Sequence, residues 1–347
     1  MKPVISIWGF GPIYRRRVKL NILEAVNSGF DDIMDYVILT DYPDDFTDFA
    51  KENKCVKAVI DVHHERSLHP WSKDLEYIPP SFNDEKAYAQ EYKQAMSEGK
   101  FFNYSLHRFS FPMIAALGYN KIVFMDGDVK IKYDQIGKNI TKEEFWAAFD
   151  TPPNTMKGCV AESIKFEPQV DGSTKFITSM GVGSCQSRNA LQLANVLVYE
   201  AMGKYGPGKE YTHIVDQLDV CEGPFRYYHF ESSDKVHDYF NVWNDNIRIC
   251  LSNQIFRNAQ MCGGYMLCDY IPVAATNYFF GIKVLNFPNT VYQRQIMYED
   301  RVFIPPRAAG LSENFQEALT QEEFMSVNKD IITRLKDLKA WPHVEPY

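Results

Sequence analysis

The chain has few cysteines and no closely spaced pair of them. Its seven cysteines, among 347 residues, are scattered from Cys55 to Cys268 without a CxxC spacing. A disulfide framework needs paired cysteines, and a structural zinc site usually takes closely spaced ones. The sequence therefore argues against both, and reduced thiols fit a cytoplasmic protein best.

Long hydrophobic runs and an excess of basic charge are also missing. No segment approaches the roughly 18 uninterrupted apolar residues of a membrane span, and the apolar run at Val4–Trp8 is too short for the core of a signal peptide. The formal net charge is −8, from 37 basic and 45 acidic residues. Such a balance gives no general attraction to nucleic acid or to an anionic membrane. We expect a soluble protein without a membrane span or targeting segment.

What the chain does have is an ordinary globular composition, with 45% hydrophobic and 14% aromatic residues. This is enough for one large core or two smaller ones, and there is no internal repeat or low-complexity linker. We expect a main domain over residues 1–310, with an insertion at about 63–100. A helical C-terminal extension is expected over residues 311–347 because apolar side chains recur there at helical spacing, namely Phe324, Val327, Ile331 and Leu335.

The first part of the chain alternates strand and helix patterns. Short apolar runs at Val4–Trp8, Tyr36–Thr40 and Val56–Val62 are typical of buried strands. Residues Tyr14–Ser28, between the first two runs, carry apolar side chains on one helical face. The alternation predicts an α/β fold whose mostly parallel mixed sheet has helices on both faces. In such folds the ligand binds beyond the carboxyl ends of the strands.

Residues 63–100 interrupt this alternation and contain three histidines, His63, His64 and His69. A histidine cluster can bind zinc. No cysteine or carboxylate completes a familiar zinc spacing here, so we favour loop or substrate-contact roles over a zinc site.

Two acidic residues follow the most regular strand pattern of the chain. The apolar run Ile122–Met125 predicts a strand covered on both faces, and Asp126, Gly127 and Asp128 come directly after it. With no side chain between the acids, the backbone can turn so that both face one small volume. Paired carboxylates offer hard oxygens to Mg²⁺ or Mn²⁺ and leave positions open for phosphate oxygens. The alternative is that Asp-Gly-Asp is only a turn.

A helix is expected over residues 106–117, just before this strand, with one apolar face formed by Leu106, Phe109, Met113 and Leu117. His107 and Arg108 lie off that face. An arginine displayed there could reach a ligand of the Asp pair, because its planar fork of donors suits phosphate or sugar oxygens. The alternative for Arg108 is a solvated helix charge.

Three segments resemble motifs of the glycogenin-like retaining glycosyltransferases, and they occur in the family's order. HRFSFPMIAALGYNKIVFMDGDVKI, at residues 107–131, is similar to the segment in which a basic helical residue precedes a strand ending in a DxD metal motif. ITSMGVG, at 177–183, resembles the segment lining the sugar pocket, and HIVDQLDV, at 213–220, resembles the Asp-Gln motif. The resemblance implies a GT-A fold and sugar transfer from a nucleotide-diphosphate donor with Mn²⁺ or Mg²⁺.

The resemblance also implies roles for individual residues. Asp126 and Asp128 would hold the metal against the donor diphosphate, and Arg108 would contact phosphate or sugar. Asp216 and Gln217 would be the catalytic residues, facing the sugar where they could stabilise positive charge developing at the anomeric carbon. A helix-surface amide is the alternative for Gln217.

Two further parts of the donor site are implied. Ser179 and Gly181 would line the sugar pocket, although a tight strand would equally explain the glycines of that segment. The loop after the first strand would hold the nucleoside, with Trp8, Gly9 and Tyr14 as its contact residues. The sequence GFGPIY departs from the family's pattern there, so the base stays open between uracil and guanine, with a UDP-sugar favoured.

The third protein ligand of the metal has two candidate positions. The family motif is a histidine followed by an aromatic, a glycine and a lysine. His229, with Lys235 as the diphosphate-binding lysine, keeps the chemistry but follows Asp216 by only 13 residues. Asn286 has the better spacing, and we favour His229 because an imidazole binds Mn²⁺ better than an amide does.

The sequence thus predicts a metal-dependent glycosyltransferase. The motifs do not identify its acceptor, and glycan, protein, lipid-linked sugar and nucleic acid all stay open. One rival is a haloacid-dehalogenase-like phosphatase, whose nucleophile motif also follows a hydrophobic strand. That motif continues with Thr or Val where this chain has Lys130. A second rival is a non-catalytic nucleotide-sugar-binding protein that keeps the fold without turnover.

Overall fold

The structure is a computed structural model that describes most of the first half of the chain and separate segments of the second half. The described residues are 2–70, 78–97, 104–127, 129–131, 163–168, 174–178, 181–185, 190–206, 218–221, 225–252, 271–282, 285–286, 292–294, 297–298 and 301–302. The expected helical extension at 311–347 lies outside them.

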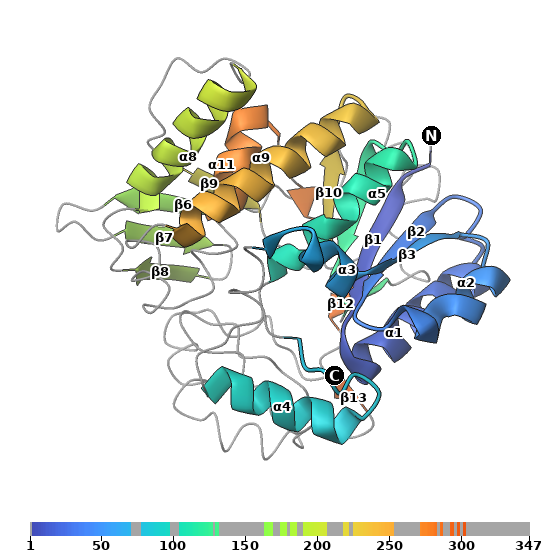
Figure 1. The fold of residues 1–347 in the computed structure, drawn as a ribbon. Helices are drawn as coiled ribbons and strands as arrows, with labels where there is room; N and C mark the ends of the chain where they lie inside the picture. Colours follow the sequence, from blue (N-terminus) through green and yellow to red (C-terminus); the bar gives the residue numbers. More distant parts are fainter. Residues whose placement is uncertain are drawn as a thin grey trace.

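Six strands form the central sheet, in the order β11-β10-β4-β1-β2-β3 (Figure 1). The parallel part consists of β1 (Val4–Gly9), β2 (Asp35–Thr40), β3 (Val56–Asp61) and β4 (Lys121–Met125). Beyond β4, two strands complete the sheet through antiparallel pairings, β10 (Phe225–His229) with β4 and β11 (Leu285–Asn286) with β10. The prediction of an α/β fold with a mostly parallel mixed sheet is confirmed.

The order of the strands creates a switch point between β1 and β4. From β1 the chain continues to β2 and β3 on one side, and it then returns to place β4 on the other side of β1. Open α/β sheets bind their ligands in the crevice beside such a point.

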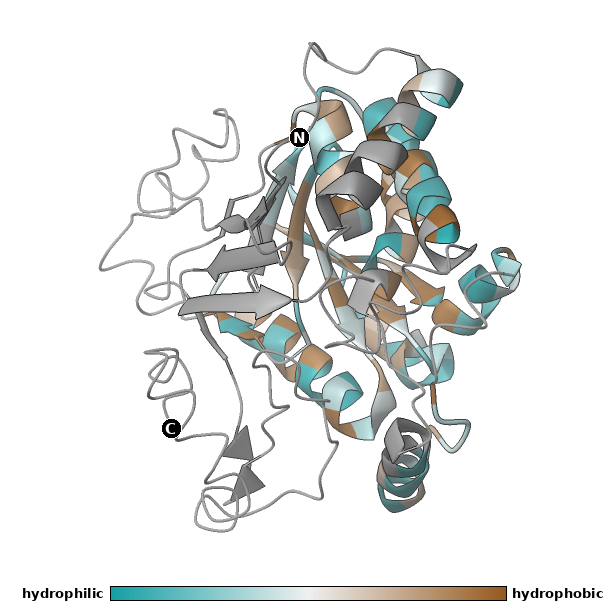
Figure 2. Ribbon diagram, turned by 90° about the vertical axis from the view of Figure 1, so that its left-hand side faces the viewer, coloured by the Kyte–Doolittle hydropathy of each residue, from teal (hydrophilic) through white to brown (hydrophobic). Residues whose placement is uncertain are grey.

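Helices cover both faces of the sheet, as Figure 1 shows. One layer contains α1 (Gly11–Asn27), the short η1 (Pro43–Phe46) and α2 (Thr47–Glu52). The other layer contains α3 (Val62–Ser67), η3 (Tyr104–Ser110), α5 (Phe111–Ala116) and α9 (Ser233–Ser252). Because both faces are covered, the strands are apolar on both sides, and hydrophobic residues concentrate in the strands at the centre of Figure 2.

Side chains of β4 illustrate how one strand serves two cores. Ile122 and Phe124 point into the core shared with α5 and α9, whereas Val123 and Met125 point into the core shared with α1. The alternation follows from the two-residue period of a strand. Asp126 comes next in the same alternation, at the end of the strand.

The helix expected over residues 106–117 is two elements. A 3₁₀ helix, η3, runs to Ser110, and α5 begins at Phe111 with Pro112 in its first turn. Proline suits a helix start because its missing N–H needs no partner there. The change of phase exposes Met113 and Leu117, each at 40%, so the expected apolar face over these two residues is wrong.

Three helices pack together beyond β10: α8 (Ala190–Tyr205), α9 and α11 (Ile271–Phe280). Two buried hydrogen bonds join α9 to α11: Tyr239 Oη donates to Asn277 Oδ1 at 2.6 Å, and Asn246 Nδ2 donates to Thr276 Oγ1 at 2.9 Å. Such paired polar groups fix the relative position of two helices because leaving either group unpaired is costly.

A second sheet has the order β8-β7-β6-β9 and is antiparallel throughout. Its strands are β6 (Ser163–Pro168), β7 (Thr174–Thr178), β8 (Gly181–Cys185) and β9 (Leu218–Cys221). Short pairings of β5 (Val129–Ile131) with β12 (Tyr292–Arg294) and of β13 (Met297–Tyr298) with β14 (Arg301–Val302) complete the described strands.

The insertion after β3 contains α4 (Glu85–Ser97), which contacts α1. The segment that leads into α4 is bonded to α1, because Arg15 Nη2 donates a hydrogen bond to the Phe82 carbonyl. Tyr88 lies so close to Gly11 that a Cβ on this glycine would be 2.9 Å from the Tyr88 ring.

Among the helices in the described ranges, none is both long and apolar enough to cross a bilayer.

Candidate functional site

The predicted metal-binding aspartate lies at the carboxyl end of β4. Asp126 follows Met125 directly and is 2% exposed, and its carbonyl accepts a hydrogen bond from Val129 N at 3.0 Å, which closes a tight turn into β5. The other predicted metal-binding aspartate, Asp128, lies outside the described residues.

Gly127 is the point at which the turn after β4 contacts the end of β1 and the first turn of α1. A Cβ at this position would lie 2.5 Å from the Trp8 carbonyl oxygen and 2.9 Å from Tyr14 Cδ1. No side chain fits at these distances, so the residue between the two acids has to be glycine for a packing reason. The turn after β4 is therefore packed against the end of β1 and the start of α1, at the switch point of the sheet.

His107 lies beside the Asp126 carboxylate, and the sequence motifs gave it no role. Its Nε2 lies 3.9 Å from Asp126 Oδ1, and the side chain is 3% exposed. The imidazole ring meets the Trp8 ring at 5.4 Å and the Phe124 ring at 4.7 Å between centroids, both edge to face. These contacts fix the ring in a position that faces the end of β4. No local pattern of the sequence indicates this contact, because His107 and Asp126 are 19 positions apart.

Two serines hold the backbone of His107 against β1. Ser110 Oγ donates to the His107 carbonyl at 2.7 Å, which leaves the Ser6 hydroxyl as the donor in the buried Ser6–Ser110 contact of 2.7 Å. On the opposite side of the turn, Asn21 Nδ2 donates to the Val129 carbonyl at 2.6 Å. The residues on both sides of Asp126 are thus tied to neighbouring elements by buried hydrogen bonds.

The predicted nucleoside-contact residues belong to an aromatic cluster beside this turn. The Trp8 ring lies 4.9 Å from the Tyr14 ring and 5.4 Å from the Phe10 ring, and all three side chains are buried. The Arg17 guanidinium lies 4.9 Å from the centroid of the Tyr14 ring. The structure thus places Trp8, Gly9 and Tyr14 next to Gly127, with the two aromatic side chains packed inside the molecule.

Arg108 lies on the same layer but is directed elsewhere. Its Nη2 donates to Tyr228 Oη at 3.0 Å, and its guanidinium lies 5.8 Å from the centroid of the Phe124 ring. The side chain is 3% exposed, so the alternative of a solvated helix charge is wrong. The described contact of Arg108 is with β10, at the middle of β4 and not at its carboxyl end.

His229 and Lys235 lie at the wrong end of the sheet for the role predicted for them. Because β10 runs antiparallel to β4, His229 pairs with Lys121, the first residue of β4, whereas Asp126 follows the last. Five residues of strand span about 16 Å. No single ion can contact both side chains, and the prediction of His229 as their shared ligand is corrected accordingly. Lys235 forms a surface ion pair with Asp238 at 2.9 Å.

The alternative position, Asn286, lies toward the carboxyl end of β4. In β11, Asn286 pairs with Arg226, which itself pairs with Phe124. The spacing argument was thus the better guide to location, and the chemical preference for a histidine at this point was misleading.

The other predicted donor-site residues are only partly described. Gly181 is the first residue of β8, where it pairs with Thr178 of β7 in the second sheet. Ser179, Asp216 and Gln217 lie outside the described residues. Their predicted roles stay predictions.

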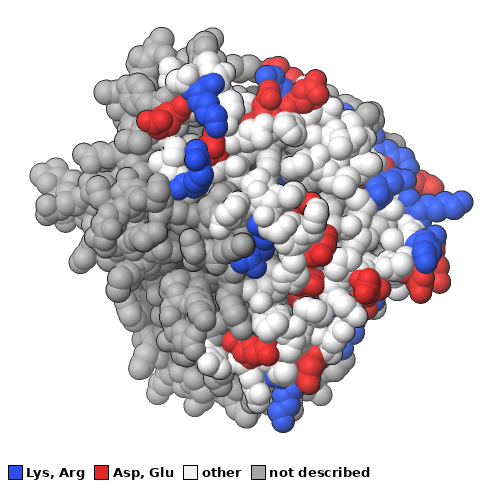
Figure 3. Space-filling view, viewed as in Figure 1, with Lys and Arg blue, Asp and Glu red and all other residues white. Residues whose placement is uncertain are grey.

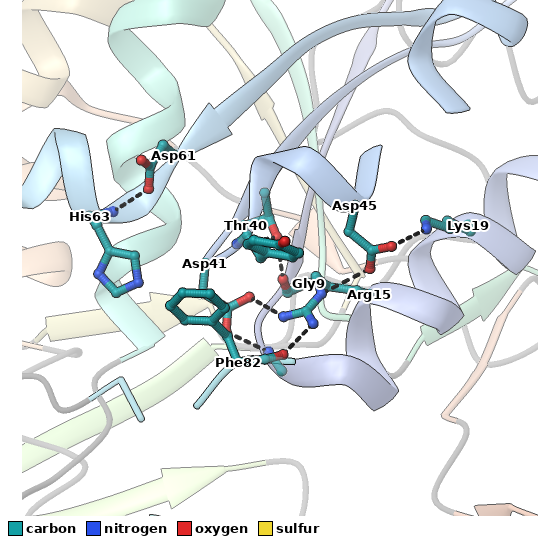
Figure 4. Close-up of polar contacts among 11 residues, drawn as sticks. Gly9, Arg15, Lys19, Thr40, Asp41, Asp45, Asp61, His63 and Phe82 are labelled. Atoms are coloured by element: carbon teal, nitrogen blue, oxygen red, sulfur yellow. Dashed lines mark hydrogen bonds and ion pairs between the residues drawn. The ribbon is translucent and has the colours of Figure 1, made fainter. Parts of the chain in front are cut away.

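A second buried aspartate, Asp41, follows β2, which is parallel to β4, and Figure 4 shows its polar contacts. Asp41 Oδ2 accepts from Gly11 N at 2.8 Å, and its Oδ1 accepts from Arg15 Nη1 at 2.8 Å. Arg15 Nε also donates to Asp45 Oδ2 at 3.0 Å, and Lys19 Nζ donates to Asp45 Oδ1 at 2.6 Å. This network joins α1 to the segment after β2.

Burial and pairing act in opposite directions on these two acids. Burial raises the pKa of the Asp41 carboxyl above its usual 3.8, and Arg15 and the Gly11 N–H oppose this rise. We assign Asp41 as the carboxylate at neutral pH because both of its donors favour that form. Burial also acts to raise the pKa of Asp45, but hydrogen bonds from Lys19 and Arg15 outweigh it and lower this pKa.

The three histidines near the insertion do not converge on one point in the described structure. The Asp61 side chain caps α3 by accepting a hydrogen bond from His63 N at 2.8 Å, and the His63 ring lies 6.3 Å from the Phe82 ring. His69 packs its ring 5.3 Å from Phe109. Over the described part of the chain there is no group of three or more His, Cys, Asp or Glu side chains able to hold a metal.

The described donors beside β4 are one carboxylate and one imidazole. Carboxylate oxygen suits Mn²⁺ and Mg²⁺, and imidazole nitrogen adds affinity for transition metals, so this pair fits Mn²⁺.

The face drawn in Figure 3 carries acidic and basic side chains interspersed, and its described residues form no continuous basic patch.

Comparison of the chain with protein-family models, with curated proteins and with solved structures finds no match.

Proposed function

We propose that the protein is a metal-dependent glycosyltransferase that uses a nucleotide-diphosphate sugar, with a UDP-sugar favoured. The observation that carries the proposal is the position of Asp126, buried at the carboxyl end of β4 and followed by Gly127, which packs against the end of β1 and the start of α1. This is the switch point of the sheet, where α/β folds bind nucleotides. The strand order, with an antiparallel strand beside β4, is compatible with the GT-A fold.

A metal-held diphosphate also accounts for the environment of α1 better than a dinucleotide site does. Dinucleotide-binding folds place the pyrophosphate on the N-terminus of the helix after β1. Here Gly11 N, at the start of α1, already donates to Asp41, and the Tyr88 ring covers Gly11. A phosphate at that helix terminus would meet a carboxylate, whereas a divalent cation at Asp126 would attract it.

In the proposed reaction the bond between the anomeric carbon and the diphosphate oxygen breaks, the acceptor hydroxyl oxygen bonds to that carbon, and the hydroxyl proton passes to the leaving nucleoside diphosphate. Asp126, together with Asp128, would hold a cation that would supply positive charge to offset that of the leaving diphosphate. Asp216 and Gln217 face the sugar by resemblance to the family. The proposal leaves His229 and Lys235 out of the donor site because of their place at the amino end of β4.

The test is turnover with a panel of nucleotide sugars. The purified protein is incubated with Mn²⁺ and each donor, and hydrolysis or transfer is measured as release of the nucleoside diphosphate. We expect release from at least one donor and its loss in Asp126→Asn. Asp45→Asn, which removes a partly exposed carboxylate of the Asp41 network, is the matched control and should retain activity.

Two outcomes would contradict the proposal. Binding of a nucleotide sugar without hydrolysis or transfer from any donor would leave a non-catalytic binding protein. Release of phosphate from simple phosphate esters, without a need for a nucleotide sugar, would favour a haloacid-dehalogenase-like phosphatase.

A further inference from the structure

The imidazole beside Asp126 has a geometry that sequence motifs did not anticipate. His107 reaches the carboxyl end of β4 from η3, an element that precedes β4 in the chain, and its Nε2 lies 3.9 Å from Asp126 Oδ1. This distance exceeds that of a hydrogen bond. The imidazole nitrogen and the carboxylate oxygen are therefore neighbours that are not hydrogen-bonded to each other.

We propose that His107 Nε2 is a protein ligand of the divalent cation held by Asp126. The inference rests on the proposed function for the presence of that cation, and it assigns to His107 the nitrogen position that the motifs assigned to His229. The described geometry favours His107 because His229 lies at the other end of β4.

The distance between the two donor atoms fits a shared ion. Ligand atoms about 2.1 Å from one cation are about 3.0 Å apart at a right angle and about 4.2 Å apart when opposite. The observed 3.9 Å lies between these limits. An ion can therefore contact both atoms with the backbones of η3 and β4 where they are.

The surroundings of His107 hold its ring ready for such a contact. Trp8 and Phe124 pack edge to face against the ring, and Ser110 fixes the backbone carbonyl of His107. A ligand that is positioned before the metal arrives loses little conformational entropy on binding.

An imidazole in the ligand set has a consequence for metal choice. Mg²⁺ prefers oxygen ligands, whereas Mn²⁺ and later transition metals accept nitrogen readily. The protein should therefore bind Mn²⁺ more tightly than Mg²⁺. Replacing His107 with Gln, whose side-chain amide reaches to a similar position, should weaken Mn²⁺ binding at least about tenfold and Mg²⁺ binding less.

Pulsed EPR of the full-length protein loaded with Mn²⁺ tests the assignment directly. Coordinated imidazole nitrogen produces a characteristic modulation of the Mn²⁺ signal, which we expect in the wild type and not in His107→Gln. The matched control is His69→Gln, another imidazole of the same layer packed on Phe109, which should keep the modulation. Wild-type protein labelled with ¹⁵N-histidine gives the same answer without a substitution, because the modulation then shifts to the ¹⁵N pattern.

The outcomes separate this inference from the proposed function. Bound Mn²⁺ that is lost in Asp126→Asn but shows no histidine nitrogen in the wild type would overturn the role of His107 and leave the metal site intact. A nitrogen signal that persists in His107→Gln would overturn it too, in favour of another histidine. Absence of Mn²⁺ binding by the wild type, with and without UDP, would overturn both proposals.

Discussion

Two buried aspartates occupy equivalent places in the sheet and have different surroundings. Asp41 follows β2 and Asp126 follows β4, at the same edge, and each is 2% exposed. Asp41 accepts from the N-terminus of α1 and from Arg15, which are fixed parts of the protein. Asp126 faces the imidazole of His107 at 3.9 Å and the turn at Gly127.

The difference shows that position at a strand end does not by itself define a functional carboxylate. The charge of Asp41 is matched by an arginine and a backbone N–H, so its role is to fasten α1 to the sheet. Asp126 has a second metal-ligand type beside it, in a turn whose glycine cannot be replaced without displacing Trp8 or Tyr14. The contacts of Asp41 account for a structural role, and the proposed function gives Asp126 the ligand-binding role.

The largest expected effect comes from breaking the Asp41 pair. Asp41→Asn leaves the buried Arg15 guanidinium without its closest carboxylate, which should lower the free energy of unfolding by about 3 kcal/mol or more. Chemical denaturation measures this change. The affinity of the remaining folded protein for Mn²⁺ should be unchanged, because the pair lies outside the site at β4.

The matched variant is Asp45→Asn, which removes a carboxylate whose side chain is 35% exposed. Solvent screens this partly exposed carboxylate, and Arg15 keeps its bond to Asp41, so the expected loss is smaller, about 1 kcal/mol. Equal losses in the two variants, or a loss of Mn²⁺ binding in Asp41→Asn alone, would remove the distinction between a structural and a functional aspartate.

Gly127→Ala should have an intermediate effect on stability and a clear effect on binding. The new methyl group would meet the Trp8 carbonyl and the Tyr14 ring, and such overpacking costs about 1–3 kcal/mol. Displacement of the turn should also weaken Mn²⁺ binding, measured by titration calorimetry. Gly203→Ala, in α8 with nothing within 4 Å of the new methyl, should instead be neutral or stabilising. Unchanged Mn²⁺ affinity in Gly127→Ala would show that the turn does not shape the site.

The smallest effect concerns pH and the Asp41 side of the sheet. Burial lowers the pKa of His63 below its usual 6.5, with Arg66 acting in the same direction and with Asp61 and Asp41 opposing it. The unfolded chain therefore takes up a proton at a higher pH than the folded protein does. The stabilising contribution is complete above pH 6.5 and is lost as the pH falls through the lower pKa of the folded state.

His63→Gln should accordingly reduce the loss of unfolding free energy between neutral and mildly acidic pH. Denaturation at several pH values measures it, with the exposed His237→Gln as the control. If the wild type and His63→Gln lose stability equally on acidification, His63 is not the responsible group.

The sequence predicted the parallel strands and α1 well because their apolar runs and helical face reflect burial on one or two sides. The broken helix at 106–117 was predicted as continuous because apolar periodicity alone does not register the new start that Pro112 imposes. The errors over the two histidines, His229 misplaced and His107 missed, have a different cause. Because β10 runs antiparallel to β4, the carboxyl end of β10 lies beside the amino end of β4. His229 therefore had the right chemistry for a metal ligand in the wrong position.

His107 was overlooked because it lies off the apolar face of a regular helix. In the 3₁₀ geometry of η3 its side chain is buried against Trp8 and Phe124 and directed to the end of β4. Such a contact joins residues 19 positions apart in sequence through tertiary packing, and local patterns carry no record of it.

The central claim is that the carboxyl end of β4 holds a divalent cation for a nucleotide diphosphate. Its most direct test is anomalous X-ray scattering from crystals grown with Mn²⁺ and UDP. The account predicts one Mn²⁺ peak about 2.2 Å from a carboxylate oxygen of Asp126, with the diphosphate on its open side. A diphosphate bound at the N-terminus of α1, with Asp126 remote from any Mn²⁺, would contradict it.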